Sequence, residues 1–230
     1  MGYNLCLFDL DGMLTNPRLG ITNSIKYALN SLNKVIPSEA VLDLFIGPPL
    51  RDSFKEFCGF DDDGAEIAIT KYREYYTDRG IFENSLYSHI EELLKTLHQS
   101  NVTMAVATSK PTVYAEKILV HFNIDKYFEL VVGSELDGRR SDKKEIIADV
   151  LNALDKDRKM NVIMIGDRKY DIIGAKAHNI PSIGCLWGYG SKEELEQAGA
   201  DYIVASPNDI ISVVFEDAKN ASSTRIINGV

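Results

Sequence analysis

Short, mostly apolar runs recur along the chain, and they constrain its fold more than any other feature of the sequence. Each run is bounded by turn-forming residues and is too short to form a helix. The runs also lack the polar alternation of a strand with one face in water, so they are typical of parallel strands buried on both faces. We assign to strands residues 3–7, 102–107, 130–132, 162–165, 182–185 and 202–204.

Helical patterns separate these runs in the second half of the chain. In residues 142–154, for example, Ile146, Ile147, Val150 and Leu151 recur at the spacing of one helix face. Strands that alternate with helices predict an α/β fold with a doubly wound parallel sheet. The other helices expected in this part are 88–98, 111–122, 170–178, 192–198 and 208–215.

A long helical insertion follows the first strand. Four amphipathic stretches, 21–32, 39–45, 50–58 and 65–76, precede the second strand. We therefore expect two domains. The expected α/β core comprises 1–14 and 82–220, the expected helical domain comprises 15–81, and 221–230 is expected to be a flexible tail because its residues are small and polar.

The net charge limits the kinds of molecule that the protein can bind, and the cysteines indicate its cellular compartment. The chain has 34 acidic and 25 basic residues and a formal charge of −9, which disfavours a nucleic acid polymer or an anionic membrane as partner. Its three cysteines form no CxxC pair, and no signal peptide or membrane span is evident. We expect a cytoplasmic protein that binds a small molecule, and the sequence leaves open whether it is a monomer or a dimer.

Two carboxylates follow the first predicted strand. Asp9 and Asp11 flank a single residue and precede Gly12. A solvated turn is the simple interpretation of an Asp-Gly pair. However, ligands of open α/β sheets bind beyond the carboxyl ends of the strands. There, one carboxylate can act as a nucleophile and the other as a general acid and base.

Hydroxyl groups and lysines follow two later strands. Thr108 and Ser109 end the second strand, where they can cap the next helix or hold a phosphoryl oxygen. Lys143 and Lys144 begin a predicted helix. Lysines on a helix are usually solvated, but a cation near a helix N-terminus opposes the dipole and hints at a nearby anion.

A second pair of carboxylates follows the strand 162–165. Asp167 comes directly after Gly166, and Asp171 lies four residues further on. Both can serve as caps, but oxygens from this segment, from the Asp9 region and from the backbone would suit Mg²⁺, which prefers hard oxygen ligands. The candidate metal ligands are Asp9, Asp11, Asp167 and Asp171.

The order and spacing of these motifs resemble the four motifs of the haloacid dehalogenase superfamily, and the helical insertion resembles its small cap. Within the superfamily, the chain is most similar to the phosphoglycolate-phosphatase-like subgroup, and the similarity covers nearly the whole chain. The motifs are Asp9-Leu10-Asp11-Gly12, Thr108, Lys143 and Gly166-Asp167-x-x-x-Asp171, with Gly47-Pro48-Pro49-Leu50 as a subgroup segment.

The resemblance implies a Mg²⁺-dependent phosphatase of small phosphorylated metabolites. Asp9 would attack phosphorus to form an aspartyl-phosphate, and Asp11 would protonate the leaving oxygen and later activate water. Thr108 would hydrogen-bond a phosphoryl oxygen, with Ser109 beside it. Apart from the resemblance, Arg51 in the insertion could reach a substrate anion, although a solvated surface arginine is the simpler interpretation.

The resemblance also implies roles for the later motifs. Lys143 would neutralise charge between Asp9 and the phosphate, and Lys144 is the alternative at one residue's distance. Asp167 and Asp171 would bind Mg²⁺. One departure is Met13, because the family usually has Thr or Val there.

Three other functions share parts of this pattern. A sugar-phosphate mutase of the same fold uses the same motifs and differs in whether water reaches the aspartyl-phosphate. A receiver-like signalling domain also combines Asp, Thr and Lys around Mg²⁺, but its acceptor Asp follows a middle strand and it lacks a long insertion. Met13 is the feature that favours an inactive relative.

Overall fold

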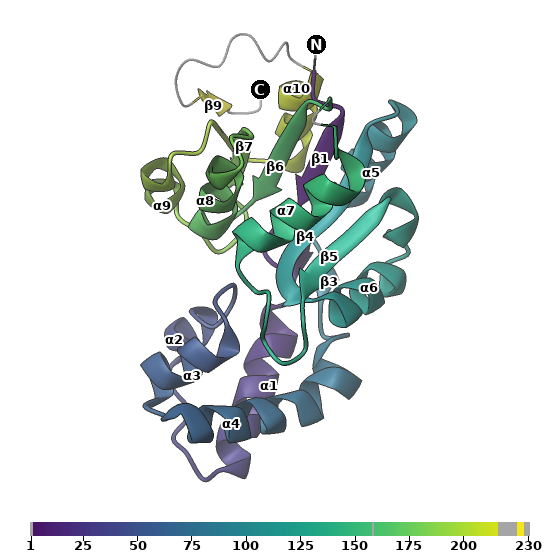
Figure 1. The fold of residues 1–230 in the computed structure, drawn as a ribbon. Coiled ribbons are helices and arrows are strands. Elements are labelled where there is room, and N and C mark those ends of the chain that lie inside the picture. The colour runs from purple at the N-terminus through teal and green to yellow at the C-terminus, as the bar shows by residue number, and fades with distance from the viewer. Residues whose placement is uncertain (1, 158, 216–224, 228–230) are drawn as a thin grey trace. The chain divides into compact units, whose positions relative to one another are not determined.

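The chain forms two compact units in a computed structural model that describes residues 2–157, 159–215 and 225–227 (Figure 1). Unit 1 comprises Met1–Leu14 and Leu86–Val230, and unit 2 comprises Thr15–Ser85. The second segment of unit 1 thus begins at Leu86, whereas the sequence-based expectation placed this boundary at 82. Two short strands mark the two crossings, β2 (Thr15–Asn16) and β3 (Ser85–Leu86), and they pair with each other.

Unit 1 is built on a parallel sheet with the strand order β5-β4-β1-β6-β7-β8-β9. The six strands predicted from apolar runs are all present, which confirms the α/β fold class. Neighbouring strands of this sheet pair in parallel in the part of the chain that the structure describes. The strands are β1 (Leu5–Phe8), β4 (Thr103–Pro111), β5 (Leu130–Ser134), β6 (Val162–Gly166), β7 (Ser182–Cys185), β8 (Tyr202–Val204) and β9 (Arg225–Ile227).

The seventh strand corrects the prediction for the C-terminal residues. We expected a flexible tail over 221–230, but β9 within it pairs in parallel with β8, with Ile203 opposite Ile226. The remaining positions of the expected tail, 221–224 and 228–230, lie outside the described residues. A three-residue strand in a polar segment carries no periodicity by which it could be found.

Helices cover both faces of this sheet (Figure 1). One face carries α7, α8 and α9, and α5, α6 and α10 lie on the other, with α5 packed against α10. Because both faces are covered, the central strands β1 and β6 are buried along their full length. The helices are α5 (Ile90–Gln99), α6 (Thr112–His121), α7 (Lys143–Leu154), α8 (Lys169–Ala177), α9 (Lys192–Ala198) and α10 (Pro207–Phe215), with a 3₁₀ turn, η2 (Asp125–Tyr127), after α6.

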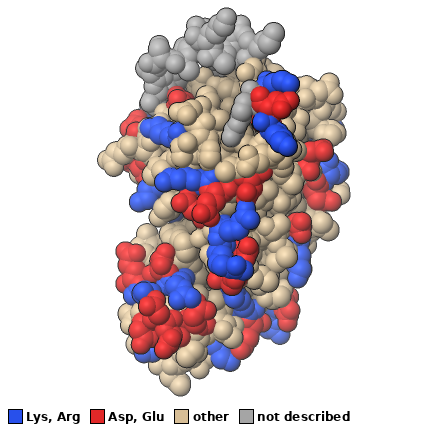
Figure 2. Space-filling model, in the orientation of Figure 1, with Lys and Arg blue, Asp and Glu red and all other residues tan. Residues whose placement is uncertain are grey.

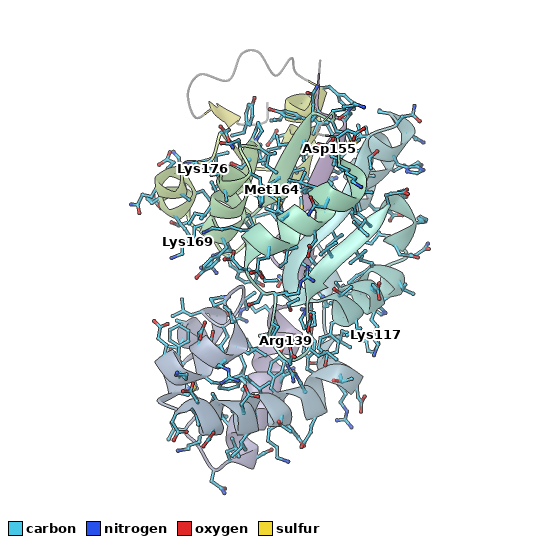
Figure 3. All side chains as sticks on the ribbon, in the orientation of Figure 1. Lys117, Arg139, Asp155, Met164, Lys169 and Lys176 are labelled. Atoms are coloured by element: carbon cyan, nitrogen blue, oxygen red, sulfur yellow. The ribbon has the colours of Figure 1, made fainter. Side chains whose placement is uncertain are left out.

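The core of unit 1 follows from the apolar spacing in the sequence. The α7 face that carries Ile146, Ile147, Val150 and Leu151 packs on apolar side chains of β1, β4 and β6. Met164 of β6 is fully buried in this cluster and lies at the middle of the sheet in Figure 3. Lys117 of α6 is exposed and extends outward.

Unit 2 is helical, as the insertion pattern predicts. Its aromatic core includes an edge-to-face contact between Phe45 and Phe54 and a stacked pair, Tyr72 and Tyr76. Asp61 caps α4 by accepting a hydrogen bond from the Gly64 amide at 2.8 Å. The elements are α1 (Arg18–Ser31), α2 (Glu39–Asp43), α3 (Leu50–Cys58), α4 (Asp62–Tyr75) and the π-helical turn η1 (Tyr76–Gly80).

The surface carries charges of both signs, and the three cysteines form no disulfide. Acidic and basic side chains are intermingled on the face seen in Figure 2. Cys6, Cys58 and Cys185 are free thiols. Among the described residues, no helix is long and apolar enough to cross a bilayer.

Candidate active site

The sheet register brings the predicted site residues to one edge. Phe8, the last residue of β1, lies opposite Val106 of β4 and Ile165 of β6. Residues just beyond these positions therefore meet at the carboxyl ends of three adjacent strands. Asp9, Thr108 and Asp167 occupy those positions, which is where open α/β sheets bind ligands.

Three buried carboxylates converge at this edge. Ligand oxygens of Asp9, Asp167 and Asp171 all lie within 4.8 Å of one another. Asp171 reaches the group from the first turn of α8, where its Oδ2 also accepts the Arg168 amide at 3.1 Å. Gly12 makes the close approach possible, because its φ is +89° and a Cβ there would overlap the Asp167 carboxylate.

Lys143, and not Lys144, is the lysine of this cluster. Its Nζ lies 2.9 Å from Asp9 Oδ1 and 2.8 Å from Asp171 Oδ1, and it donates to the Ala107 carbonyl at 2.9 Å. Three acceptor groups thus match the three N–H groups of the ammonium. Lys144 is exposed, and its carbonyl is bound to the His178 ring. The geometry therefore favours Lys143 over Lys144, and its contact with substrate stays a prediction.

The carboxylate of Asp11 lies outside the three-carboxylate group, so its place among the candidate metal ligands stays a prediction. Its Oδ2 instead meets Nζ of Lys110 at 2.5 Å, and both side chains are largely buried. Burial raises the pKa of Asp11 above its ordinary value, whereas the Lys110 ammonium opposes that rise. Asp11 thus has a cation partner of its own, whereas Asp9 and Asp171 share Lys143.

The loop after β7 holds Asp167. The Tyr189 amide donates to Asp167 Oδ2 at 2.7 Å, and a Cβ on Gly188 would overlap the same carboxylate. Trp187 fixes the loop by donating its indole N–H to the Met13 carbonyl at 3.0 Å. The side chain of Met13 is fully buried and belongs to the apolar core.

The electrostatics of the cluster reflect burial first and neighbouring charge second. Burial raises the pKa of Asp167 well above its usual value, and the carboxylates of Asp171 and Asp9 raise it further. Burial raises the pKa of Asp171 to about 6, although the ammonium of Lys143 opposes the shift. Burial by itself would lower the pKa of Lys143, but Asp171 and Asp9 outweigh it and the pKa rises.

The donor set fits a divalent cation such as Mg²⁺. Asp167 Oδ1 is buried and has no hydrogen-bond partner among the described residues, and Asp9 and Asp171 each aim an oxygen at the same group. Three buried carboxylates and the partly buried Asp11 lie with two ammonium groups, those of Lys143 and Lys110. This acidic excess and the all-oxygen ligands are what Mg²⁺ requires.

Other candidate residues have partners that the sequence did not indicate. Thr108 is buried, and its Oγ1 accepts the Lys110 amide at 3.3 Å. The Ser109 hydroxyl donates to the Ser141 carbonyl at 3.0 Å and so links β4 to the segment before α7. Arg51 is paired within unit 2 with acidic side chains of α4, Asp62 and Glu66. Substrate contacts of Thr108, Ser109 and Arg51 stay predictions.

Lys110 and a pair of tyrosines beside the site were not expected from the sequence. The hydroxyls of Tyr189 and Tyr87 hydrogen-bond, and burial, followed by the charge of Asp167, raises the pKa of Tyr87 to about 12. Tyr189 follows the carboxyl end of β7, and this position is the feature of the sequence that could have indicated its place beside the site. Lys110 stands next to the Thr108 motif, but nothing in its spacing indicated Asp11 as its partner.

We expect Gly188→Ala to weaken Mg²⁺ binding by about 10- to 100-fold, because the new Cβ displaces the carboxylate that the loop holds. Calorimetric titration of Mg²⁺ measures the effect. Gly138→Ala is the matched control. It places Ala at a positive φ of +85° where no atom lies within 4 Å, so it strains the backbone and leaves Mg²⁺ affinity unchanged. Equal affinity in Gly188→Ala and the wild type would contradict the role of the loop.

Comparison with known proteins identifies several relatives. A 5′-nucleotidase from Pseudomonas aeruginosa is 44% identical over 193 residues, which is 84% of this chain and 87% of the relative. Tyrosine-protein kinase PtkA from Mycobacterium tuberculosis is 36% identical over 86% of this chain and 67% of its own length. A phosphoglycolate phosphatase from Colwellia psychrerythraea is 28% identical over 89% of this chain and 94% of the relative.

Solved structures and a family model agree with these relatives. The crystal structure of a "predicted phosphatase" from Clostridium acetobutylicum has a TM-score of 0.85 and 46% identity, and the match covers 92% of this chain and 98% of that one. The model for haloacid dehalogenase-like hydrolases matches residues 6–185, which include every candidate site residue in both units. The chain therefore belongs to the haloacid dehalogenase-like hydrolase family.

Proposed function

We propose that this chain is a Mg²⁺-dependent phosphoric monoester hydrolase that acts through a phosphorylated Asp9. The observation that carries the proposal is the buried group of Asp9, Asp167 and Asp171, with Lys143 bound to two of them. A carboxylate nucleophile, a compensating cation and a metal-ligating pair are the parts that phosphoryl transfer uses. Phosphatases among the relatives support the same conclusion.

The reaction has two displacements at phosphorus. In the first, an Asp9 oxygen bonds to phosphorus, the bond to the ester oxygen breaks, and Asp11 donates its proton to that leaving oxygen. In the second, Asp11 takes a proton from water, the water oxygen bonds to phosphorus, and the bond to Asp9 breaks to release phosphate. Lys143 holds Asp9 in place, and its ammonium offsets the repulsion between the Asp9 carboxylate and the negative phosphoryl oxygens.

The metal is assigned to Asp9, Asp167 and Asp171. Bound there, Mg²⁺ supplies positive charge that offsets the phosphoryl oxygens. The Tyr189 amide keeps Asp167 Oδ2 occupied, so Oδ1 is the atom left to ligate. This assignment rests on the chain's own oxygens and explains why Asp167 has an unpartnered buried oxygen.

Nucleoside 5′-monophosphates are the substrate class that we place first. The support is the 44% identity to the Pseudomonas aeruginosa 5′-nucleotidase, against 28% to the Colwellia psychrerythraea phosphoglycolate phosphatase. Our sequence-based expectation favoured the phosphoglycolate-like subgroup, and 2-phosphoglycolate is the second class to test. The role of unit 2 as a cap over the substrate stays a prediction.

Phosphate release from a panel of esters tests the function. We expect release from nucleoside 5′-monophosphates that depends on Mg²⁺ and exceeds release from 2-phosphoglycolate and sugar phosphates. The opposite order would reassign the substrate class and leave the hydrolase intact. A product that is an isomer of a sugar phosphate, without free phosphate, would instead establish the mutase. No release from any ester, with or without Mg²⁺, would contradict the proposal and favour an inactive relative.

A further inference from the structure

Lys110 makes a contact that the reaction described above does not use. Its Nζ lies 2.5 Å from Asp11 Oδ2, and the exposed fractions of the two side chains are 7% and 15%. The partners are 99 residues apart in the sequence and come from β4 and from the turn after β1. A buried ion pair over this separation is a fixed feature of the fold rather than a local surface pair.

The two buried lysines at this edge serve different acids. Lys143 binds Asp9 and Asp171, and its third acceptor is a backbone carbonyl. Lys110 faces Asp11, which lies outside the three-carboxylate group. The direct contacts of the two ammonium groups therefore differ: Lys143 contacts the proposed nucleophile and a metal ligand, and Lys110 contacts the proposed proton-transfer residue.

Hydrogen bonds hold the backbone around Lys110, and burial of its side chain restricts the ammonium. The Lys110 amide donates to Thr108 Oγ1 at 3.3 Å. The neighbouring Ser109 is held on both sides, since its hydroxyl donates to the Ser141 carbonyl and its own carbonyl accepts the Ser134 hydroxyl at 2.8 Å. A lysine anchored in this way can hold a partner side chain in one orientation.

The contact also distinguishes the two oxygens of Asp11. Oδ2 is occupied by Lys110, whereas Oδ1 is buried and has no hydrogen-bond partner among the described residues. A carboxyl group carries its proton on one oxygen at a time. With Oδ2 facing an ammonium, which has only donors, Oδ1 is the oxygen that can carry a proton.

We propose that Lys110 is a positioning residue that fixes Asp11 so that Oδ1 exchanges the proton with the leaving group and then with water. The inference rests on the proposed phosphatase function. In the first displacement, the Oδ1–H bond breaks as the leaving oxygen takes the proton and its bond to phosphorus opens. The carboxylate that remains is then stabilised by the Lys110 ammonium.

An alternative role for Lys110 gives a different result in the same experiment. If the ammonium instead bound the phosphoryl group, its removal would weaken binding and turnover alike for every ester. If it acts through Asp11, its removal harms those esters whose leaving oxygen needs a proton. Esters with the same aryl frame and different leaving groups separate the two roles.

The test compares phenyl phosphate with 2,4-dinitrophenyl phosphate in the presence of Mg²⁺. We expect Lys110→Met to lower kcat/KM for phenyl phosphate by about 10²-fold and for the dinitrophenyl ester by less than about 3-fold, because the latter leaves without protonation. Asp11→Asn should show the same selective loss, and the double variant should lose no more than Asp11→Asn alone. Lys117→Met, an exposed lysine on α6, is the matched control and leaves both values unchanged.

The outcomes are separable. Equal losses for both esters, or a raised KM for both, overturn the positioning role while the phosphatase function stands. A wild type that hydrolyses neither aryl ester and releases no phosphate from the ester panel overturns the proposed function and this inference with it. If Lys110→Met does not fold, as judged by circular dichroism, Lys110→Arg takes its place. It keeps the charge and alters the reach, so it must still show a selective loss for phenyl phosphate.

Discussion

Asp9→Asn should lower kcat/KM for every phosphate ester by at least about 10³-fold, because an amide cannot form the covalent bond to phosphorus that the reaction requires. The substitution is nearly isosteric, and Lys143 keeps Asp171 and the Ala107 carbonyl as partners. The protein should therefore fold, and the loss should lie in kcat. Steady-state kinetics with circular dichroism of the same preparation measures both.

Asp125→Asn is the matched control for this loss. Asp125 is exposed in the turn η2 of the same unit, and the change from Asp to Asn removes the same charge. Its kcat/KM should equal that of the wild type. An Asp9→Asn variant that retains more than about a tenth of wild-type activity would show that Asp9 is not the nucleophile, since a lost nucleophile leaves no such remainder.

Mg²⁺ should raise the unfolding temperature by about 5–10 °C at a concentration near 100 times its dissociation constant. Ligand linkage at that ratio contributes about 2.7 kcal/mol, and each kcal/mol moves Tm by about 2–4 °C in a protein of this length. Asp167→Asn should abolish the shift, because it removes the ligand whose Oδ1 has no other partner. Differential scanning calorimetry with and without Mg²⁺ provides the measurement.

The metal-free Asp167→Asn variant supplies an internal control. In the wild type, Asp167 is buried beside two like charges that raise its pKa, so its removal should leave the metal-free Tm equal or higher. A variant that still gains several degrees from Mg²⁺ would place the metal elsewhere. A lower metal-free Tm together with an unchanged Mg²⁺ shift would contradict both parts of this account.

The pH dependence of the Mg²⁺ effect follows from the same groups. Burial raises the folded-state pKa values of Asp171, to about 6, and of Asp167 above the ordinary value near 4. Raised carboxyl pKa values favour the protonated folded state, so without metal their contribution to stability is present below about pH 4 and is lost as pH rises through about 6. Because Mg²⁺ binds the ionised carboxylates, its stabilisation should be larger near pH 7.5 than near pH 5. Equal Tm shifts at the two pH values would contradict this coupling.

The sheet could be predicted because its strands are buried, and the clustering of the motifs could be predicted because parallel strands end at one edge. Strands covered on both faces have few polar positions, so apolar runs located the six strands from β5 to β8 in the sheet order. The carboxyl ends of parallel strands share one edge, so the sequence predicts that Asp9, Thr108 and Asp167 lie close together, and the register of β1 with β4 and β6 agrees. The two-residue strands β2 and β3 and the strand β9 are too short to show a period.

The choice between the two lysines was also present in the helix pattern. Lys143 precedes Ile146 and Ile147 by three and four residues, which places it on the buried face of α7. Lys144 is rotated by about 100° from it and faces outward. In contrast, no local spacing could pair Lys110 with Asp11, because that contact depends on the turn after β1 and on a register shift at the end of β4.

Reductive trapping of the working enzyme tests the central claim most directly. Acid quenching during turnover of a substrate, followed by borohydride, converts an aspartyl-phosphate to homoserine, and peptide mass spectrometry locates the change. We predict homoserine at position 9 and not at position 11, formed only when substrate and Mg²⁺ are both present and absent in Asp9→Asn. Steady phosphate release without homoserine at position 9, or homoserine at another aspartate, would contradict the account.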